Sequence, residues 1–170
     1  MNKKVREKMI AIGAMVVLSF GIIVGIRAVN GSSKSEGIAL DTSAYTNENA
    51  SVIEAFALGE SEDAITGYAV TASSIGFNAE TPITLKITFD ADKTTITNFE
   101  VVSQAETTGL GANVESDEFK AMFVNTTAPV YTADMTAKGT NFDQITGATV
   151  SSKAVAYAVN AASDFLATME

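Results

Sequence analysis

The sequence lacks residues on which much protein chemistry depends: its 170 residues include no histidine, no cysteine and no tryptophan. Without histidine and cysteine, the chain can form no Ser-His-Asp triad, no cysteine nucleophile and no His or thiolate zinc site. Histidine-ligated haem and iron–sulfur clusters are excluded for the same reason. Any redox role must therefore use an organic cofactor. The length suits one domain of ordinary size with a short additional segment.

Positive charge is scarce after the first 27 residues. Residues 1–27 carry five basic and one acidic side chain, a net charge of +4, whereas residues 28–170 carry six basic and nineteen acidic ones, a net charge of −13. Binding to nucleic acid needs clustered Lys and Arg, so we expect no nucleic-acid partner. Anionic lipid headgroups would also repel the larger part of the chain. Its acidity is typical of an exposed, soluble domain.

One uncharged apolar segment, residues 9–26, is eighteen residues long. This length is just enough for a helix to cross a bilayer. Four basic residues precede it within residues 1–8, whereas only Arg27 and Lys34 follow closely. The positive-inside rule therefore predicts a cytoplasmic N-terminus at 1–8, a single transmembrane helix at 9–26 and an extracytoplasmic domain. A cleaved signal peptide is the alternative, but no small-x-small cleavage pattern closes the apolar segment.

The remaining chain divides into a predicted flexible linker, 27–45, and a folded domain, 46–170. The linker contains the Gly/Ser-rich stretch Asn30–Gly37. In the domain, the apolar residues of Asn47–Leu58 follow a helical pattern, so we expect an amphipathic helix there. The stretch Ala64–Ser73 is rich in strand-forming residues.

A hairpin is the clearest feature of the domain. Residues 81–90 alternate strictly between apolar and polar side chains, Asp90–Lys93 supplies a turn, and residues 94–104 begin a second strand. Val114–Phe123 reads as a short helix capped by Ser116 or Asn113. A final helix is expected from Ser151 to Met169. Hairpin strands and helices in separate runs predict an α+β fold.

Two further segments are not required to build a core. Glu106–Ser116 combines glycines with hydroxyl groups after the second hairpin strand, and Ile145–Val155 places Thr149 behind Gly147 and Ala148 at the start of the last helix. The first segment could be only a tight turn, and the second only a helix entry with Thr146, Ser151 or Ser152 as cap. However, a helix N-terminus also suits a bound phosphate, and small neighbours leave the Thr149 hydroxyl accessible.

The stretch Thr146–Ser151, read Thr-Gly-Ala-Thr-Val-Ser, resembles the flavinylation motif of FMN-binding subunits. In that motif Ser or Asp, Gly, any residue, Thr, any residue, and Ser or Thr follow one another. The resemblance implies that Thr149 carries FMN through a phosphoester bond, and Thr146 departs from the usual Ser or Asp. It extends over about residues 60–170, because the family also has a hairpin that leads into a Glu-Thr-x-Gly-Leu-Gly segment.

By the same resemblance, that segment should approach the flavin. Leu110 would pack on the ring, and backbone N–H groups near Gly109 and Gly111 would bond its polar edge. Glu106 is interpreted as an acceptor from the flavin or from backbone, or else as a surface carboxylate. Lys153 either balances the phosphate charge or is solvated. The cofactor-binding set is Thr149, Thr146, Gly147, Ala148, Ser151, Glu106, Thr107, Gly109, Leu110 and Gly111, with no catalytic residue and no metal ligand expected.

An N-terminal anchor followed by one such domain resembles the G subunit of the Rnf complexes, which couple electron transfer between ferredoxin and NAD to ion movement. The C subunit of the sodium-translocating NADH:quinone reductases has a similar plan. The resemblance implies a single-pass subunit of the cell membrane that relays electrons through covalent FMN. Its partners would be the other membrane subunits and, during maturation, a flavin transferase that takes FMN from FAD and releases AMP.

Two other functions remain open from the sequence. One is a flavinylated extracytoplasmic carrier that serves a different electron-transfer chain. The other is an anchored binding module without flavin, whose Thr-rich hairpin contacts a protein or a wall component. The coupled ion, sodium or proton, is not determined by this chain.

Overall fold

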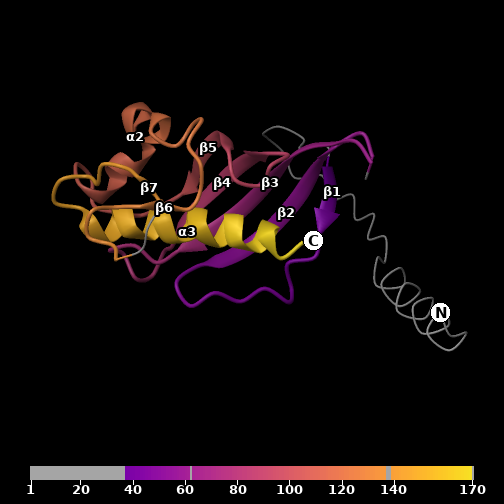
Figure 1. The fold of residues 1–170 in the computed structure, drawn as a ribbon. Coiled ribbons are helices and arrows are strands. Elements are labelled where there is room, and N and C mark those ends of the chain that lie inside the picture. The colour runs from indigo at the N-terminus through magenta and orange to yellow at the C-terminus, as the bar shows by residue number, and fades with distance from the viewer. Residues whose placement is uncertain (1–36, 62, 137–138, 170) are drawn as a thin grey trace, which may run out of the picture. The chain divides into compact units, whose positions relative to one another are not determined.

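The computed structural model describes residues 37–61, 63–136 and 139–169, which all belong to one compact unit (Figure 1). The predicted transmembrane helix 9–26 and cytoplasmic segment 1–8 lie outside these residues. Within the described part of the chain, no helix is both long and apolar enough to cross a membrane. The predicted antiparallel strands and C-terminal helix are both present.

The main sheet is a five-stranded antiparallel meander in which each strand pairs with its neighbours in sequence. Its strands are β1 (Gly37–Leu40), β2 (Ser51–Gly59), β3 (Ile65–Ser74), β4 (Ile83–Asp90) and β5 (Ile96–Ser103). The hairpin predicted over 81–104 is confirmed as β4 and β5. Two further strands of two residues each, β6 (Val130–Tyr131) and β7 (Thr140–Asn141), pair in parallel apart from the main sheet.

The helix predicted over Asn47–Leu58 is wrong, because residues 51–59 form strand β2. Strand β2 hydrogen-bonds to β1 on one side and to β3 on the other, so its backbone is satisfied by the two neighbouring strands. A bulge between Val52 and Glu54 leaves Ile53 out of the β3 register and 53% exposed. This bulge interrupts the period-two alternation, and the apolar residues then imitate a helical spacing.

Strand β1 lies inside the range that the sequence assigned to the linker, 27–45. It covers only four residues, and its pairing with Ala55–Leu58 of β2 holds it at the sheet edge. An edge strand this short carries little local signal, because its stability comes from the neighbouring strand. The domain therefore starts earlier than the composition suggested.

Three helical segments follow the sheet: the 3₁₀ helix η1 (Gly111–Glu115), α2 (Asp117–Ala121) and α3 (Thr149–Ala167). Of the two predicted caps, Ser116 is the one that caps α2, by accepting a hydrogen bond of 3.2 Å from the Phe119 backbone N–H. The helix predicted over Val114–Phe123 is shorter in the structure, because its first two residues belong to η1. Helix α3 begins two residues before the predicted start, with Ala148 at the N-cap position. None of the three candidate caps supplies a side-chain cap to α3.

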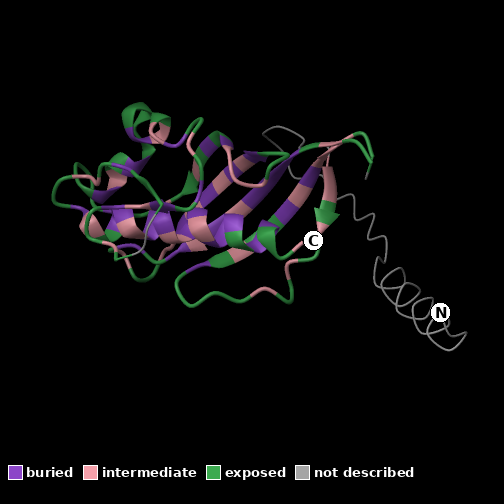
Figure 2. Cartoon of the chain, in the orientation of Figure 1, coloured by how far each residue is buried: buried purple, intermediate pink, exposed green. Residues whose placement is uncertain are grey.

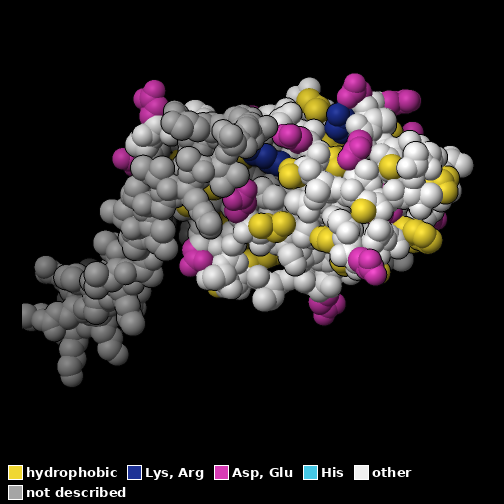
Figure 3. Space-filling model, turned by 180° about the vertical axis from the view of Figure 1, so that it is seen from behind, with side chains coloured by type: hydrophobic (Ala, Val, Ile, Leu, Met, Phe, Trp, Pro, Cys, Tyr) yellow, Lys and Arg dark blue, Asp and Glu magenta, His cyan; other side chains and the backbone are white. Residues whose placement is uncertain are grey.

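The core lies between one face of the sheet and α3. Buried positions alternate along β4, fill most of β3 and continue along the inward side of α3 (Figure 2). Four phenylalanines extend this core beneath η1 and α2, namely Phe99, Phe119, Phe123 and Phe142. The start of α3 and the segment before η1 therefore pack on the same hydrophobic core. Figure 3, seen from behind, shows acidic side chains spread over the surface and few basic ones.

Candidate functional site

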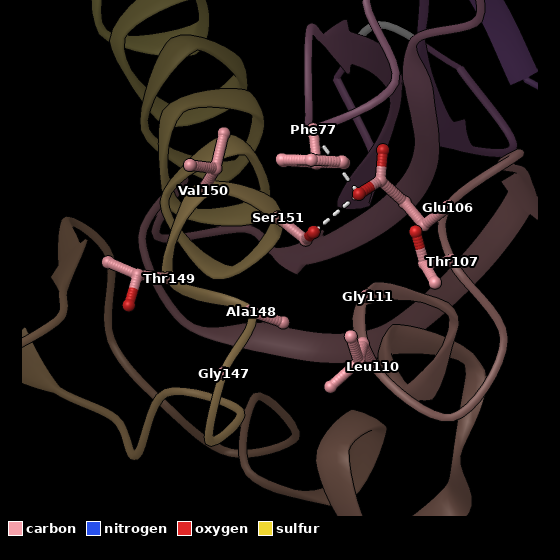
Figure 4. Close-up of a pocket in the computed structure, with 10 residues that line it drawn as sticks. All are labelled: Phe77, Glu106, Thr107, Leu110, Gly111, Gly147, Ala148, Thr149, Val150 and Ser151. Atoms are coloured by element: carbon pink, nitrogen blue, oxygen red, sulfur yellow. Dashed lines mark hydrogen bonds between the residues drawn. The ribbon is translucent and has the colours of Figure 1, made fainter.

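An open pocket of about 280 Å³ lies where three segments meet: the β3–β4 loop (75–82), the stretch that leads into η1, and the N-terminus of α3. Figure 4 shows its side chains. The lining residues are Phe77, Glu106, Thr107, Leu110, Gly111, Gly147, Ala148, Thr149, Val150 and Ser151. Most of them come from the two segments that the sequence singled out, which lie about forty residues apart in the chain.

A tight turn positions the start of α3. The Ala148 N–H donates to the Ile145 carbonyl at 2.9 Å, and Gly147 has a φ of +77°, a conformation that glycine adopts without strain. The Ser152 hydroxyl accepts from the Ile145 N–H and donates to the Ala148 carbonyl, each at 3.0 Å. Among the described residues no side chain caps α3. The positive end of its dipole is therefore available to an anion.

Glu106 lies across the pocket from the start of α3 and binds groups of the β3–β4 loop and of α3. Its side chain is only 7% exposed. Its carboxylate accepts hydrogen bonds from the Phe77 N–H at 3.1 Å and from the Ser151 hydroxyl (Figure 4). It also accepts one from the Asn78 N–H at 3.0 Å. Of the roles left open by the sequence, backbone acceptor is the one observed, and a surface carboxylate is excluded by the burial.

Apolar side chains surround the mouth of the pocket. Phe77 is 72% exposed, Val150 51% and Leu110 44%. They are three of the seven large apolar side chains that the described residues expose. Exposed apolar groups that gather at one concave site are typical of a ligand-binding surface. Their arrangement beside an uncapped helix terminus fits a ligand that has both a flat apolar ring and a phosphate.

Thr149 is the first residue of α3 and is partly exposed. Its side chain points away from the Ser151–Glu106 pair (Figure 4). Ser151 and Ser152 are buried, at 1% and 0% exposure. Thr149 is thus the accessible hydroxyl among these three.

Eight of the ten predicted site residues line this pocket, and two do not. Thr146 lies in the preceding turn, and Gly109 shapes the approach to η1 with a φ of +77°. Lys153 lines a separate groove beside α3, together with Asp164. Burial raises the pKa of the Asp164 carboxyl above its ordinary value.

Two lining residues were missed by the sequence predictions, Phe77 and Val150. Phe77 lies in the loop between β3 and β4, and nothing in its local pattern relates it to residues 106–111 or to α3. Val150 occupies the motif position at which any residue is allowed. A large apolar residue directly after a glycine, between two strand-forming stretches, was the one available signal for Phe77.

Replacement of Gly147 by alanine should destabilise the site. A non-glycine residue at positive φ costs about 1–2 kcal/mol, and the added Cβ of Gly147→Ala would lie 3.3 Å from Leu110 Cδ2. We expect a loss of about 1–2 kcal/mol in the free energy of unfolding, measured by chemical denaturation. Gly109→Ala is the matched control, because Gly109 has the same φ of +77° but no heavy atom within 4 Å of its added Cβ. If Gly147→Ala lowered the free energy of unfolding less than Gly109→Ala, the close approach of the added Cβ to Leu110 would not contribute to the loss.

Comparison with known proteins identifies the family. The model of the FMN-binding domain matches residues 76–164, just over half of the chain. This range includes residues 76–82 of the β3–β4 loop, the segment 106–111 and the start of α3, so it contains every residue that lines the pocket. The chain belongs to the FMN-binding domain family.

The chain is similar to two curated relatives of the kind that the sequence motifs predicted. The chain is 37% identical over 111 residues to the G subunit of an ion-translocating oxidoreductase complex from Methanosarcina acetivorans, covering 65% of this chain and 57% of the relative. It is 35% identical over 96 residues to the G subunit of a proton-translocating ferredoxin:NAD(+) oxidoreductase complex from Clostridium ljungdahlii, covering 56% and 50%. The predicted similarity to such subunits is confirmed. The chain spans about half the length of these relatives.

The fold is shared with a solved structure. The crystal structure of NqrC from Shewanella oneidensis superposes with a TM-score of 0.52 at 16% identity, over 67% of this chain and 61% of that one. The C subunit of the Na(+)-translocating NADH-quinone reductase from Parabacteroides distasonis gives a TM-score of 0.47 at 21% identity, over 68% and 76%. At 16% identity, the similarity to the Shewanella protein concerns the fold alone.

Proposed function

We propose that this chain is the flavin-carrying subunit of an Rnf-type ion-translocating oxidoreductase, with FMN attached to Thr149 through a phosphoester bond. It is a single-pass protein of the cell membrane whose FMN-binding domain lies on the extracytoplasmic side. The observation that carries the proposal is the pocket at the uncapped N-terminus of α3, which Thr149, the first residue of that helix, helps to line. The family and the two curated relatives support the same function.

The residues of the pocket fit such a cofactor. The first backbone N–H groups of α3 and its dipole stabilise phosphate charge beside Thr149. The exposed side chains of Phe77, Leu110 and Val150 supply apolar contact for a ring system. Gly147 and Ala148 keep the approach to Thr149 free of large side chains. Bound FMN supplies reversible electron transfer, and the protein controls its orientation and surroundings.

The other hydroxyl groups of the motif are less suitable acceptors. The Ser151 hydroxyl is buried and donates to Glu106, and the Ser152 hydroxyl both accepts and donates within the turn. Thr146 is exposed but does not line the pocket. Only Thr149 combines an accessible hydroxyl with a place at the helix terminus. Its modification is therefore selective even though four hydroxyl residues lie within seven positions.

The proposed function requires two kinds of protein partner. A flavin transferase would join the FMN phosphorus of FAD to the Thr149 oxygen and break the bond to AMP, which leaves with the hydroxyl proton. The catalytic groups for this transfer belong to the transferase, so this chain needs no catalytic base of its own. The other membrane subunits of the complex give electrons to the attached flavin and take them from it. The chain alone is not expected to catalyse the complete oxidoreductase reaction.

The test is the intact mass of the full chain after co-expression with a flavin transferase. We expect a gain equal to the mass of FMN less one water, flavin fluorescence that survives denaturation, and a modified peptide that contains residues 145–155. Expression without the transferase is the control. A chain that gains no mass beside a positive control protein would refute the flavin proposal and favour the anchored binding module. Flavin loading without neighbouring genes for the other Rnf subunits would favour a different electron-transfer chain.

A further inference from the structure

The carboxylate of Glu106 has an unusual environment for a buried acid. It accepts three hydrogen bonds, two from backbone N–H groups of the β3–β4 loop and one from Ser151 on α3. Among the residues that the structure describes, no lysine or arginine pairs with it. A buried carboxylate without a cation depends on all its hydrogen bonds, so the surrounding groups cannot move away without a large cost.

Two glycines make room for this carboxylate from opposite sides. A Cβ added to Gly76 in the β3–β4 loop would collide with Glu106 Oε1. A Cβ added to Gly111 at the start of η1 would collide with the Ser151 hydroxyl and lie 2.7 Å from Glu106 Oε2. Backbone from two separate segments therefore packs directly against the same acid.

We propose that Glu106 and Ser151 are positioning residues, which join the β3–β4 loop to the first turn of α3 and so fix the direction of Thr149. This Glu106 clasp consists of Glu106, Ser151 and the N–H groups of Phe77 and Asn78. The inference rests on the proposed function of the pocket as the flavin site. The proposal gives the hydroxyl of Ser151, the last residue of the motif, a role that differs from flavin attachment.

Helix geometry explains how the clasp acts on Thr149. Successive residues of an α-helix are about 100° apart around its axis, so residues two positions apart point in nearly opposite directions. Ser151 points towards Glu106, and Thr149 points away from it (Figure 4). Holding Ser151 inward therefore keeps the Thr149 hydroxyl outward. The same carboxylate holds the Phe77 backbone, so one group fixes both the acceptor and an apolar side of the pocket.

Hydrogen exchange of the full, flavin-free chain tests the clasp directly. For Glu106→Gln and for Ser151→Ala, we expect peptides from the β3–β4 loop, 75–82, to exchange about tenfold faster or more, because a buried hydrogen-bond partner is lost. Peptides from β3 and β4 should change much less. Glu100→Gln is the matched control, since it removes the same charge from an exposed position on β5. Equal acceleration throughout the sheet, or none in the loop, would overturn the proposal.

The rate of flavin loading tests the positioning role. Glu106→Gln and Ser151→Ala should each load Thr149 at least about tenfold more slowly than Glu100→Gln, while the double variant should be no slower than the slower single one, because both changes break one coupled unit. Wild-type loading rates in either single variant would overturn the positioning role. A wild-type chain that takes up no flavin would instead refute the proposed function, and the exchange result on the flavin-free chain would stand independently.

Discussion

Loading of Thr149→Ala with FMN is expected to fall to background when the full chain is co-expressed with a flavin transferase. The substitution removes the accessible hydroxyl at the first position of α3, and the neighbouring Ser151 and Ser152 hydroxyls are buried and engaged. The phosphoester needs an oxygen on this side chain, so the expected effect is complete loss. Intact mass and in-gel fluorescence of the denatured chain measure it.

Two variants serve as controls for this loss. Thr149→Ser keeps a hydroxyl at the same helical position and should still gain the mass of FMN less one water. Thr107→Ala makes the same chemical change as Thr149→Ala on another lining residue of the pocket and should also stay loaded. Full loading of Thr149→Ala would contradict the assignment, and peptide mapping would then identify the true acceptor.

Local patterns predicted the parts of the fold whose side chains repeat with a clear period. Strand β4 alternates strictly, because its apolar residues Ile83 to Phe89 face α3 at every second position. Helix α3 buries most of its circumference, and its large apolar residues recur at the spacing expected for a helix on a sheet. Strand β4 and helix α3 were therefore visible in the sequence, whereas the two-residue strands β6 and β7 were not predicted.

The elements that were missed are strands whose local pattern is short or interrupted. Strand β2 is defined by its pairing with β1 and β3, and its bulge at Ile53 disturbs the local period. Strand β1 has four residues and needs β2 to hold it. A pattern read along the chain contains neither pairing, so the same apolar residues were assigned to a helix.

The sequence predicted most residues of the candidate site but not the contacts between them. The segment 106–111 and the start of α3 were expected to share one cofactor, and they line one pocket. The role of Glu106 could not be chosen from the sequence, because its hydrogen-bond partners Phe77 and Ser151 lie 29 and 45 positions away. Only the folded sheet brings the loop, the acid and the helix together.

The largest loss of stability is expected for Phe123→Ala. Phe123 is fully buried at 0% exposure and stacks on Phe99 with ring centroids 4.4 Å apart. It also contacts Phe119 and Phe142, with centroids at 5.3 and 4.8 Å. Removing a ring from the centre of this cluster leaves a cavity, so the free energy of unfolding should fall by about 3–5 kcal/mol. Chemical denaturation followed by circular dichroism measures the change.

Phe77→Ala is the matched control, because it removes the same ring from a position that is 72% exposed. Its free energy of unfolding should stay within about 0.5 kcal/mol of the wild type, as is usual for surface substitutions. If the ring of Phe77 contacts the attached flavin, the loaded variant should instead show lower flavin fluorescence anisotropy than the loaded wild type. Comparison of the two variants thus distinguishes a phenylalanine that packs the core from one that contacts the cofactor. A similar loss of stability for both variants would contradict this separation and would place Phe77 in the core.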